Sequence, residues 1–134
     1  MAALGGLSLW LSACSGTGFD ERAGLSCVDD SPECIARREA TLKSMLADRD
    51  RKWVREAPTA KAHASGVRLF AFRSKKAELS CADLVHGRKE AEAAPRALRG
   101  QQGLSPAQIS RASLFAAEVG KELAAEIRRR RCRA

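Results

Sequence analysis

Five cysteines and two histidines are the side chains in this 134-residue chain best suited to nucleophilic or metal chemistry. Catalysis by a thiol needs a neighbouring base, and the two imidazoles that could serve are His63 and His86. Asp83, His86 and Glu90 are spaced by three and four residues, so they would share one face of a helix. The set lacks a second liganding element. We therefore interpret it as a solvated polar face and predict no metal site and no cofactor.

Acidic side chains near a predicted helix start form the other group with possible metal chemistry. Asp29, Asp30 and Glu33 flank Ser31-Pro32, and they could collect a cation. Helix capping and the helix dipole explain acids at this place without a ligand. The sequence contains no glycine-rich phosphate loop, serine nucleophile elbow or zinc-type cysteine spacing. The sequence thus predicts a protein that is not an enzyme.

Charge divides the chain into a mildly acidic beginning and a basic body. The formal net charge is +8 and the mean hydropathy is −0.30. Residues 1–34 carry a net charge of −4, whereas residues 35–76 hold twelve cations against four acids. No apolar run approaches the eighteen residues that a spanning helix needs. These features predict one small basic domain with an acidic or neutral appendage.

The first thirteen residues have no charge and are rich in alanine, leucine and glycine, which is typical of a signal segment. Leu11-Ser12-Ala13-Cys14 resembles the lipobox of bacterial lipoproteins. The resemblance implies attachment of a diacylglyceryl group to the Cys14 thiol, cleavage before Cys14 and an acylated new N-terminus. The two or three acyl chains contribute about 0.8 kcal/mol per buried methylene. Ser15 resembles the sorting pattern for the outer membrane. The implied location is the bacterial cell envelope, with the protein lipid-anchored in the outer membrane and facing the periplasm.

The remaining four cysteines lie in the body and are predicted to form two disulfides, because an exported protein meets an oxidising compartment. We favour a local Cys27–Cys34 bond and a Cys81–Cys132 bond that closes a loop of about 50 residues and contributes about 4 kcal/mol in the chain-entropy model. The two other pairings stay open. The predicted organisation is a signal segment at 1–13, a flexible tether at 14–26 and a helical domain at 27–134.

The helical domain reads as mainly α, a small bundle of three or four helices. A helix is predicted from Ser31-Pro32 to Pro58, with one apolar stripe that includes Trp53. A second is predicted from Ser80 to about Ala94, and a third from Ser105 into the arginine run at 128–131. Residues 67–73 fit either a helix or an extended segment. Proline and glycine at positions 95–103 predict a connection.

Basic side chains on the first predicted helix are the remaining candidates for function. Such a basic face can attract anionic lipid, surface polysaccharide or an acidic envelope protein. Nucleic acid is disfavoured as a partner because the protein is predicted to be exported and has few aromatic residues for stacking. A solvated surface without a ligand remains the alternative. The face consists of Arg37, Arg38, Lys43, Arg49, Arg51, Lys52 and Arg55.

The predicted function is therefore structural or interactive: a lipid-anchored envelope protein that binds or spaces envelope components through its basic helical face. Two alternatives stay open. One is a small periplasmic enzyme or accessory that uses a thiol or a metal. The other is a cytosolic nucleic-acid binder, which requires that the signal segment is not used. The sequence predicts neither a specific ligand nor an oligomeric state.

Overall fold

The computed structural model describes residues 23–133, and over that range it contains five α-helices, two 3-10 helices and no strand. The predicted mainly α class is confirmed, although the helices number five rather than three or four. The signal segment, Cys14 and the tether up to residue 22 lie outside the described residues. The elements are η1 (Ala23–Ser26), α1 (Pro32–Ala47), η2 (Lys52–Arg55), α2 (Ala60–Ser65), α3 (Val67–Lys75), α4 (Cys81–Leu98) and α5 (Pro106–Arg129).

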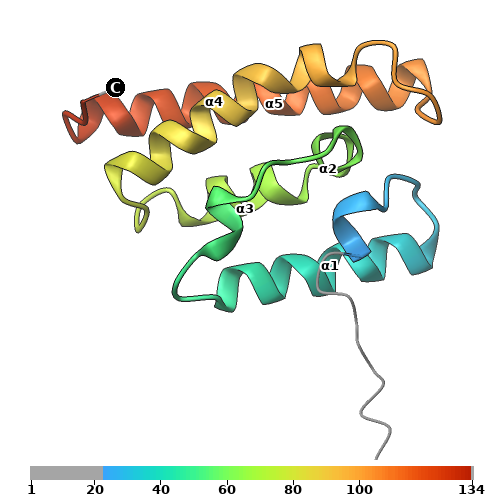
Figure 1. The fold of residues 1–134 in the computed structure, drawn as a ribbon, viewed down its shortest axis with the longest axis horizontal. Helices are drawn as coiled ribbons and strands as arrows, with labels where there is room; N and C mark the ends of the chain where they lie inside the picture. The colour runs from blue at the N-terminus through green and yellow to red at the C-terminus, as the bar shows by residue number, and fades with distance from the viewer. Residues whose placement is uncertain (1–22, 134) are drawn as a thin grey trace, which may run out of the picture.

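The helices are arranged in three levels (Figure 1). The long helices α4 and α5 run antiparallel along one side, α1 lies along the opposite side, and the short helices α2 and α3 fill the space between. Phe72 on α3 is completely buried at the centre, and the ring of Trp53 meets it edge-on with centroids 4.9 Å apart. The core therefore depends on α3 being held between the α4–α5 pair and α1.

The first predicted helix ends eleven residues before Pro58. α1 begins where expected, with the Ser31 hydroxyl accepting from the Cys34 N–H, but it stops at Ala47. The Asp48 carboxylate then accepts from two main-chain N–H groups, and Arg51 adopts a left-handed conformation with φ of 49°. This turn carries Trp53 back against α1, where its indole N–H donates to the main-chain oxygen of Met45. Trp53 thus joins the core by chain reversal and not by helical periodicity.

The prediction that a helix ends near Ala94 is also wrong, because α4 continues through Pro95 to Leu98. Leu98 is completely buried, so the additional turn removes a large apolar side chain from water. Gly100, with φ of 71°, follows directly and supplies the left-handed residue that often ends a helix. The third predicted helix is confirmed: α5 starts with a complete capping box between Ser105 and Gln108.

The ambiguous segment at 67–73 is helical and belongs to α3. The short helix α2 precedes it, with Thr59 as its N-cap, and only Gly66 separates the two. Gly66 has φ of 73°, a conformation that glycine adopts without strain, so the chain can turn between α2 and α3 in one residue. These two short helices account for the difference from the expected helix number.

The favoured disulfide pairing is present. Cys27 bonds to Cys34 and Cys81 bonds to Cys132, each with Cα atoms 5.4 Å apart. The first bond closes the acidic loop before α1. The second ties the start of α4 to the end of α5, over a sequence separation of 51 residues.

The segment η1 lies within the predicted tether, and it packs against α1. Gly24 is buried, and its N–H donates to the Thr41 hydroxyl on α1 at 3.0 Å. A Cβ on Gly24 would lie 2.4 Å from the main-chain oxygen of Arg37, so only glycine allows η1 to approach α1 this closely. No helix in residues 23–133 has the length and apolar character needed to cross a bilayer.

Candidate functional site: an apolar groove between two arginines

Two of the seven predicted basic-face residues make internal contacts. Arg38 donates to the main-chain oxygens of Cys27 and Asp29, at 3.0 and 2.6 Å, and to the sulfur of Cys34. Arg51 lies 3.6 Å from the buried carboxylate of Asp83. These two arginines therefore help to hold the fold and are not simply part of a solvated cationic face.

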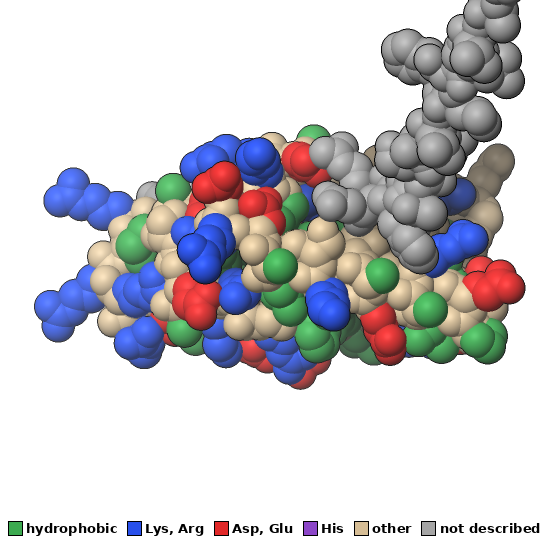
Figure 2. All heavy atoms as spheres, turned by 90° about the horizontal axis from the view of Figure 1, so that it is seen from below, with side chains coloured by type: hydrophobic (Ala, Val, Ile, Leu, Met, Phe, Trp, Pro, Cys, Tyr) green, Lys and Arg blue, Asp and Glu red, His purple; other side chains and the backbone are tan. Residues whose placement is uncertain are grey.

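The other five basic residues, Arg37, Lys43, Arg49, Lys52 and Arg55, are exposed. They are spread over α1, the turn after it and η2. On the side of the molecule that α1 forms, Figure 2 shows Lys and Arg side chains interspersed with acidic and hydrophobic ones. The predicted basic face is therefore a mixed surface rather than a continuous cationic patch.

Three of the residues singled out for metal chemistry, Asp83, Glu90 and Asp29, have other partners. Asp83 faces Arg51, Glu90 is buried against Arg68, and His86 is exposed on α4. Asp29 accepts from the Ser31 N–H, and hydrogen bonding by Ser31 lowers the pKa of the Asp29 carboxyl. Within residues 23–133, no group of three or more His, Cys, Asp or Glu side chains is placed to hold a metal ion.

A buried ionic cluster lies beside α2. Arg68 and Glu90 form a bidentate pair, with nitrogen–oxygen distances of 2.6 and 2.9 Å, and both side chains are almost fully buried. His63 is also buried, and its Nδ1 atom has no hydrogen-bond partner among the described residues. Burial lowers the pKa of His63; Glu90 opposes this effect and Arg68 adds to it. The cluster joins η2, α2, α3 and α4, and it is closed to solvent.

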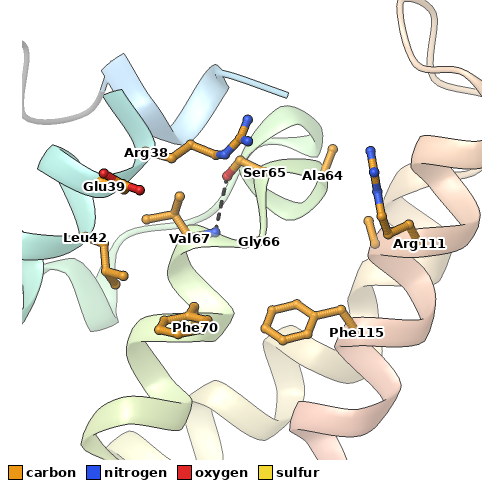
Figure 3. Close-up of a pocket in the computed structure, with 11 residues that line it drawn as sticks. Arg38, Glu39, Leu42, Ala64, Ser65, Gly66, Val67, Phe70, Arg111 and Phe115 are labelled. Atoms are coloured by element: carbon orange, nitrogen blue, oxygen red, sulfur yellow. Dashed lines mark hydrogen bonds between the residues drawn. The ribbon is translucent and has the colours of Figure 1, made fainter. Parts of the chain in front are cut away.

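An apolar groove of about 290 Å³ opens between α1, the α2–α3 junction and α5 (Figure 3). Phe70 on α3 and Phe115 on α5 face each other across it, with Leu42 on α1 at its side. Phe70 is 45% exposed, which is unusual for a large aromatic side chain in so small a core. The volume lies near the lower limit for small-ligand pockets.

Two arginines flank the upper end of this groove in Figure 3, Arg38 from α1 and Arg111 from α5. The carboxylate of Asp30 bridges them: one oxygen lies 3.6 Å from the Arg38 guanidinium and the other lies 3.4 Å from that of Arg111. Asp30 belongs to the loop that the Cys27–Cys34 disulfide closes. The groove therefore combines an apolar floor with a position where two cations share one carboxylate.

The apolar surface continues along α5 beyond the groove. Leu114 is 70% exposed and borders a second, shallower depression of about 500 Å³ that also includes Arg111 and Phe115. Arg73 lies over the Phe115 ring, 5.8 Å from its centroid, and pairs with Glu122 at 2.9 Å. Residues at 107, 110, 111, 114, 115 and 118 thus expose one stripe of α5 beside the groove.

Sequence reasoning missed this groove. The sequence leaves residues 67–73 open between a helix and an extended segment, and in a helix Phe70 and Phe72, two positions apart, point to nearly opposite sides. One of the two therefore could not share the core with the other, and Phe70 is the exposed one. Arg111 stood outside the basic cluster of the first helix and gave no signal, because its neighbour Arg38 comes from a segment 73 residues earlier.

The groove is the strongest candidate functional site in residues 23–133, since it joins exposed aromatic surface to two cations. The four cysteines of this region are held in disulfides, and the buried histidine is closed to solvent. Comparisons with protein-family models, with curated proteins and with solved structures find no match for this chain.

Proposed function

We propose that this protein is a non-enzymatic, lipid-anchored component of the bacterial cell envelope that binds an acidic partner protein through the groove between Arg38 and Arg111. The anchor would be the acyl chains of a diacylglyceryl group on the Cys14 thiol, and the location would be the periplasmic face of the outer membrane. The proposal keeps the interaction role predicted from the sequence but moves the binding surface from the basic face of α1 to the groove.

The lipid anchor is supported by two independent features. Leu11-Ser12-Ala13-Cys14 has the composition of a lipobox. The helical domain carries two disulfides, which persist in oxidising compartments and are rare in the cytosol. Both features suit a protein that acts outside the cytoplasm.

The binding role is carried by one observation: the exposed Phe70 and the partly buried Phe115 line the same groove as the cations Arg38 and Arg111. Apolar surface rimmed by polar groups is typical of protein interaction sites. Leu114 extends the apolar surface along α5, as an amphipathic helix with acidic residues would require. Arginine and aromatic residues are also the types that dominate binding energy at interfaces.

Intact mass spectrometry of the natively expressed protein, with and without reduction, tests the anchor. We expect a chain that lacks residues 1–13 and carries acyl chains, and that gains one pair of hydrogens per disulfide on reduction. The Cys14→Ser variant serves as the control and should lose both cleavage and acylation. A native protein that retains residues 1–13 with every thiol reduced would overturn the envelope location and favour the cytosolic alternative.

Calorimetric titration with designed peptides tests the binding role. The probes are a helical peptide of glutamate and leucine and its counterpart of lysine and leucine. We expect the protein to bind the acidic peptide and not the basic one. The Phe70→Ser variant should bind the acidic peptide with at least tenfold lower affinity. Arg99→Gln, which removes an exposed cation that does not line the groove, should leave binding unchanged. Equal binding of both peptides, or full binding by Phe70→Ser, would contradict the proposal.

A further inference from the structure

The bridging position of Asp30 carries an inference about the ligand itself, and it rests on the proposed function. We infer that the groove recognises a carboxylate attached to an apolar group, and that Asp30 is a competitor built into the chain for the carboxylate position. The partner would therefore anchor itself by one acidic group next to one apolar group. It would have to displace Asp30 in order to bind.

The geometry of the two arginines supports a carboxylate. Each oxygen of Asp30 is directed to a different guanidinium, at 3.6 Å for Arg38 and 3.4 Å for Arg111. Arg38 is fixed by its bonds to main-chain oxygens of the disulfide loop, so it does not need Asp30 to keep its place. The arrangement accepts one carboxylate between the fixed Arg38 and the exposed Arg111, and Asp30 shows that this group fits.

The two ion pairs that Asp30 makes are weak enough for an external carboxylate to displace it. The side chains of Asp30 and Arg111 are 66% and 63% exposed, and both nitrogen–oxygen distances are long for an ion pair. Exposed pairs of this kind contribute little to stability. An external carboxylate that also covers Phe70 and Phe115 gains apolar burial, which Asp30 on its loop does not provide. The Cys27–Cys34 disulfide keeps the competitor near the site.

The lining of the groove narrows the class of ligand further. Glu39 on α1 lies at its edge, so a doubly charged phosphate would meet more repulsion than a carboxylate. The Ser65 hydroxyl, which also lines the groove, already makes hydrogen bonds within the chain: it donates to the main-chain oxygen of Ala62 and accepts from the Val67 N–H. The surrounding main chain is helical and internally bonded, so it offers little for an extended peptide to pair with. A carboxylate on a compact apolar group fits these conditions best.

Titration of the purified full-length chain with phenylbutyrate, phenylbutanol and phenyl phosphate tests the inference. The expected order is phenylbutyrate first, with the alcohol and the phosphate at least fivefold weaker. Arg111→Gln should remove the preference for the carboxylate, and it changes an exposed side chain, so the fold should persist. Equal affinity for the acid and the alcohol would overturn the inference, because the groove would then bind apolar groups alone. Tighter binding of the phosphate would overturn the ligand class.

Asp30→Asn tests the competitor. It should tighten phenylbutyrate binding by about two- to fivefold, the range that exposed ion pairs allow. In the Arg111→Gln background the same change should have a smaller effect, since one of its two partners is gone. Asp50→Asn, which neutralises an exposed acid in the turn after α1, is the matched control and should change nothing. If Asp30→Asn leaves phenylbutyrate binding unchanged or weakens it, Asp30 is not a competitor. The proposed function would still stand in that case, provided that the acidic peptide still binds.

Discussion

Arg68 donates two hydrogen bonds to the Glu90 carboxylate and also donates to the main-chain oxygens of Trp53 and Glu56. One buried guanidinium therefore holds together α3, α4 and the turn that follows α1. The loop oxygens that it binds come from the segment where the predicted first helix breaks off. Without this partner, the main-chain oxygens of Trp53 and Glu56 would each lose one hydrogen bond to a buried cation.

Glu90→Gln should destabilise the domain by about 3–5 kcal/mol, because it leaves the Arg68 charge buried without its counter-charge. Glu92→Gln is the matched control. Glu92 pairs with Arg88 at 3.6 Å, but its side chain is 64% exposed, so we expect a change within about 0.5 kcal/mol. Urea unfolding of both variants measures the difference. Similar losses of stability in the two variants would show that the buried pair contributes no more than the exposed one.

Removing the Cys81–Cys132 bond should cost more stability than removing the Cys27–Cys34 bond. The first closes a loop of 51 residues and the second a loop of 7, which corresponds to about 4 and about 2.5 kcal/mol in the chain-entropy model. Paired serine variants of each bond, unfolded in urea, give the two values. The reverse order would mean that the local loop at residues 27–34 does more than restrict the unfolded chain.

Gly87→Ala should destabilise the protein although alanine favours helices. A Cβ at this position of α4 would lie 2.5 Å from Cδ1 of Phe72, a ring fixed at the centre of the core. Overpacking costs about 1–3 kcal/mol, more than the gain of about 1 kcal/mol in helix propensity. At Gly120 on α5 the nearest atom to a new Cβ is that of Ala91 at 3.4 Å, so Gly120→Ala should be neutral or stabilising. Thermal unfolding of the Gly87→Ala and Gly120→Ala variants measures the difference. If Gly87→Ala is as stable as the wild type, the Phe72 ring can move to make room.

The sequence predicts the helices that begin at a strong N-cap. It does not predict the helix ends that are determined by tertiary contacts. Ser31, Ser80 and Ser105 all accept from the third residue of their helices, as local chemistry requires. The end of α1 depends instead on Trp53 turning back to Met45, and the extension of α4 past Pro95 depends on the burial of Leu98. Propensity and periodicity describe neighbours in the chain, and these contacts are made across it.

The arginine run at the end of α5 shows the same limit within one helix. Cations in the last turn of a helix complement its dipole and can bind its last carbonyl groups. Arg130 instead donates to the main-chain oxygens of Lys76 and Leu79, at the end of α3 and in the turn after it. Arg130 thus binds carbonyl groups at the end of another helix, whereas Arg129 pairs with Glu126 of α5 itself. Sequence spacing could not identify them, since the partners are more than 50 residues apart.

The candidate site was beyond sequence reasoning for a related reason. Its cations Arg38 and Arg111 and its aromatic residues Phe70 and Phe115 come from three separate helices. Each is ordinary in its own segment, and the combination exists only when α1, α3 and α5 meet. The disulfide loop that carries Asp30 could be predicted from cysteine spacing, but its position against Arg111 could not.

Buried His63 should make the stability of the domain fall as the pH drops below about 6.5. Burial lowers its pKa below the value of about 6.5 that it has in the unfolded chain. The unfolded chain therefore binds a proton that the folded protein excludes. The free energy of unfolding is level above about pH 6.5 and falls as the pH drops below it, by at most about 1.4 kcal/mol per pH unit.

Urea unfolding of the wild type and His63→Gln across this range measures the effect. The variant should lose the slope, whereas His86→Gln, which changes an exposed imidazole on α4, should keep it. Glu126 does not interfere: hydrogen bonds from Arg129 and Arg130 lower its pKa to about 2, so its contribution is lost only as the pH falls from about 4.5 towards that value. An unchanged slope in His63→Gln would show that this histidine does not cause the pH dependence.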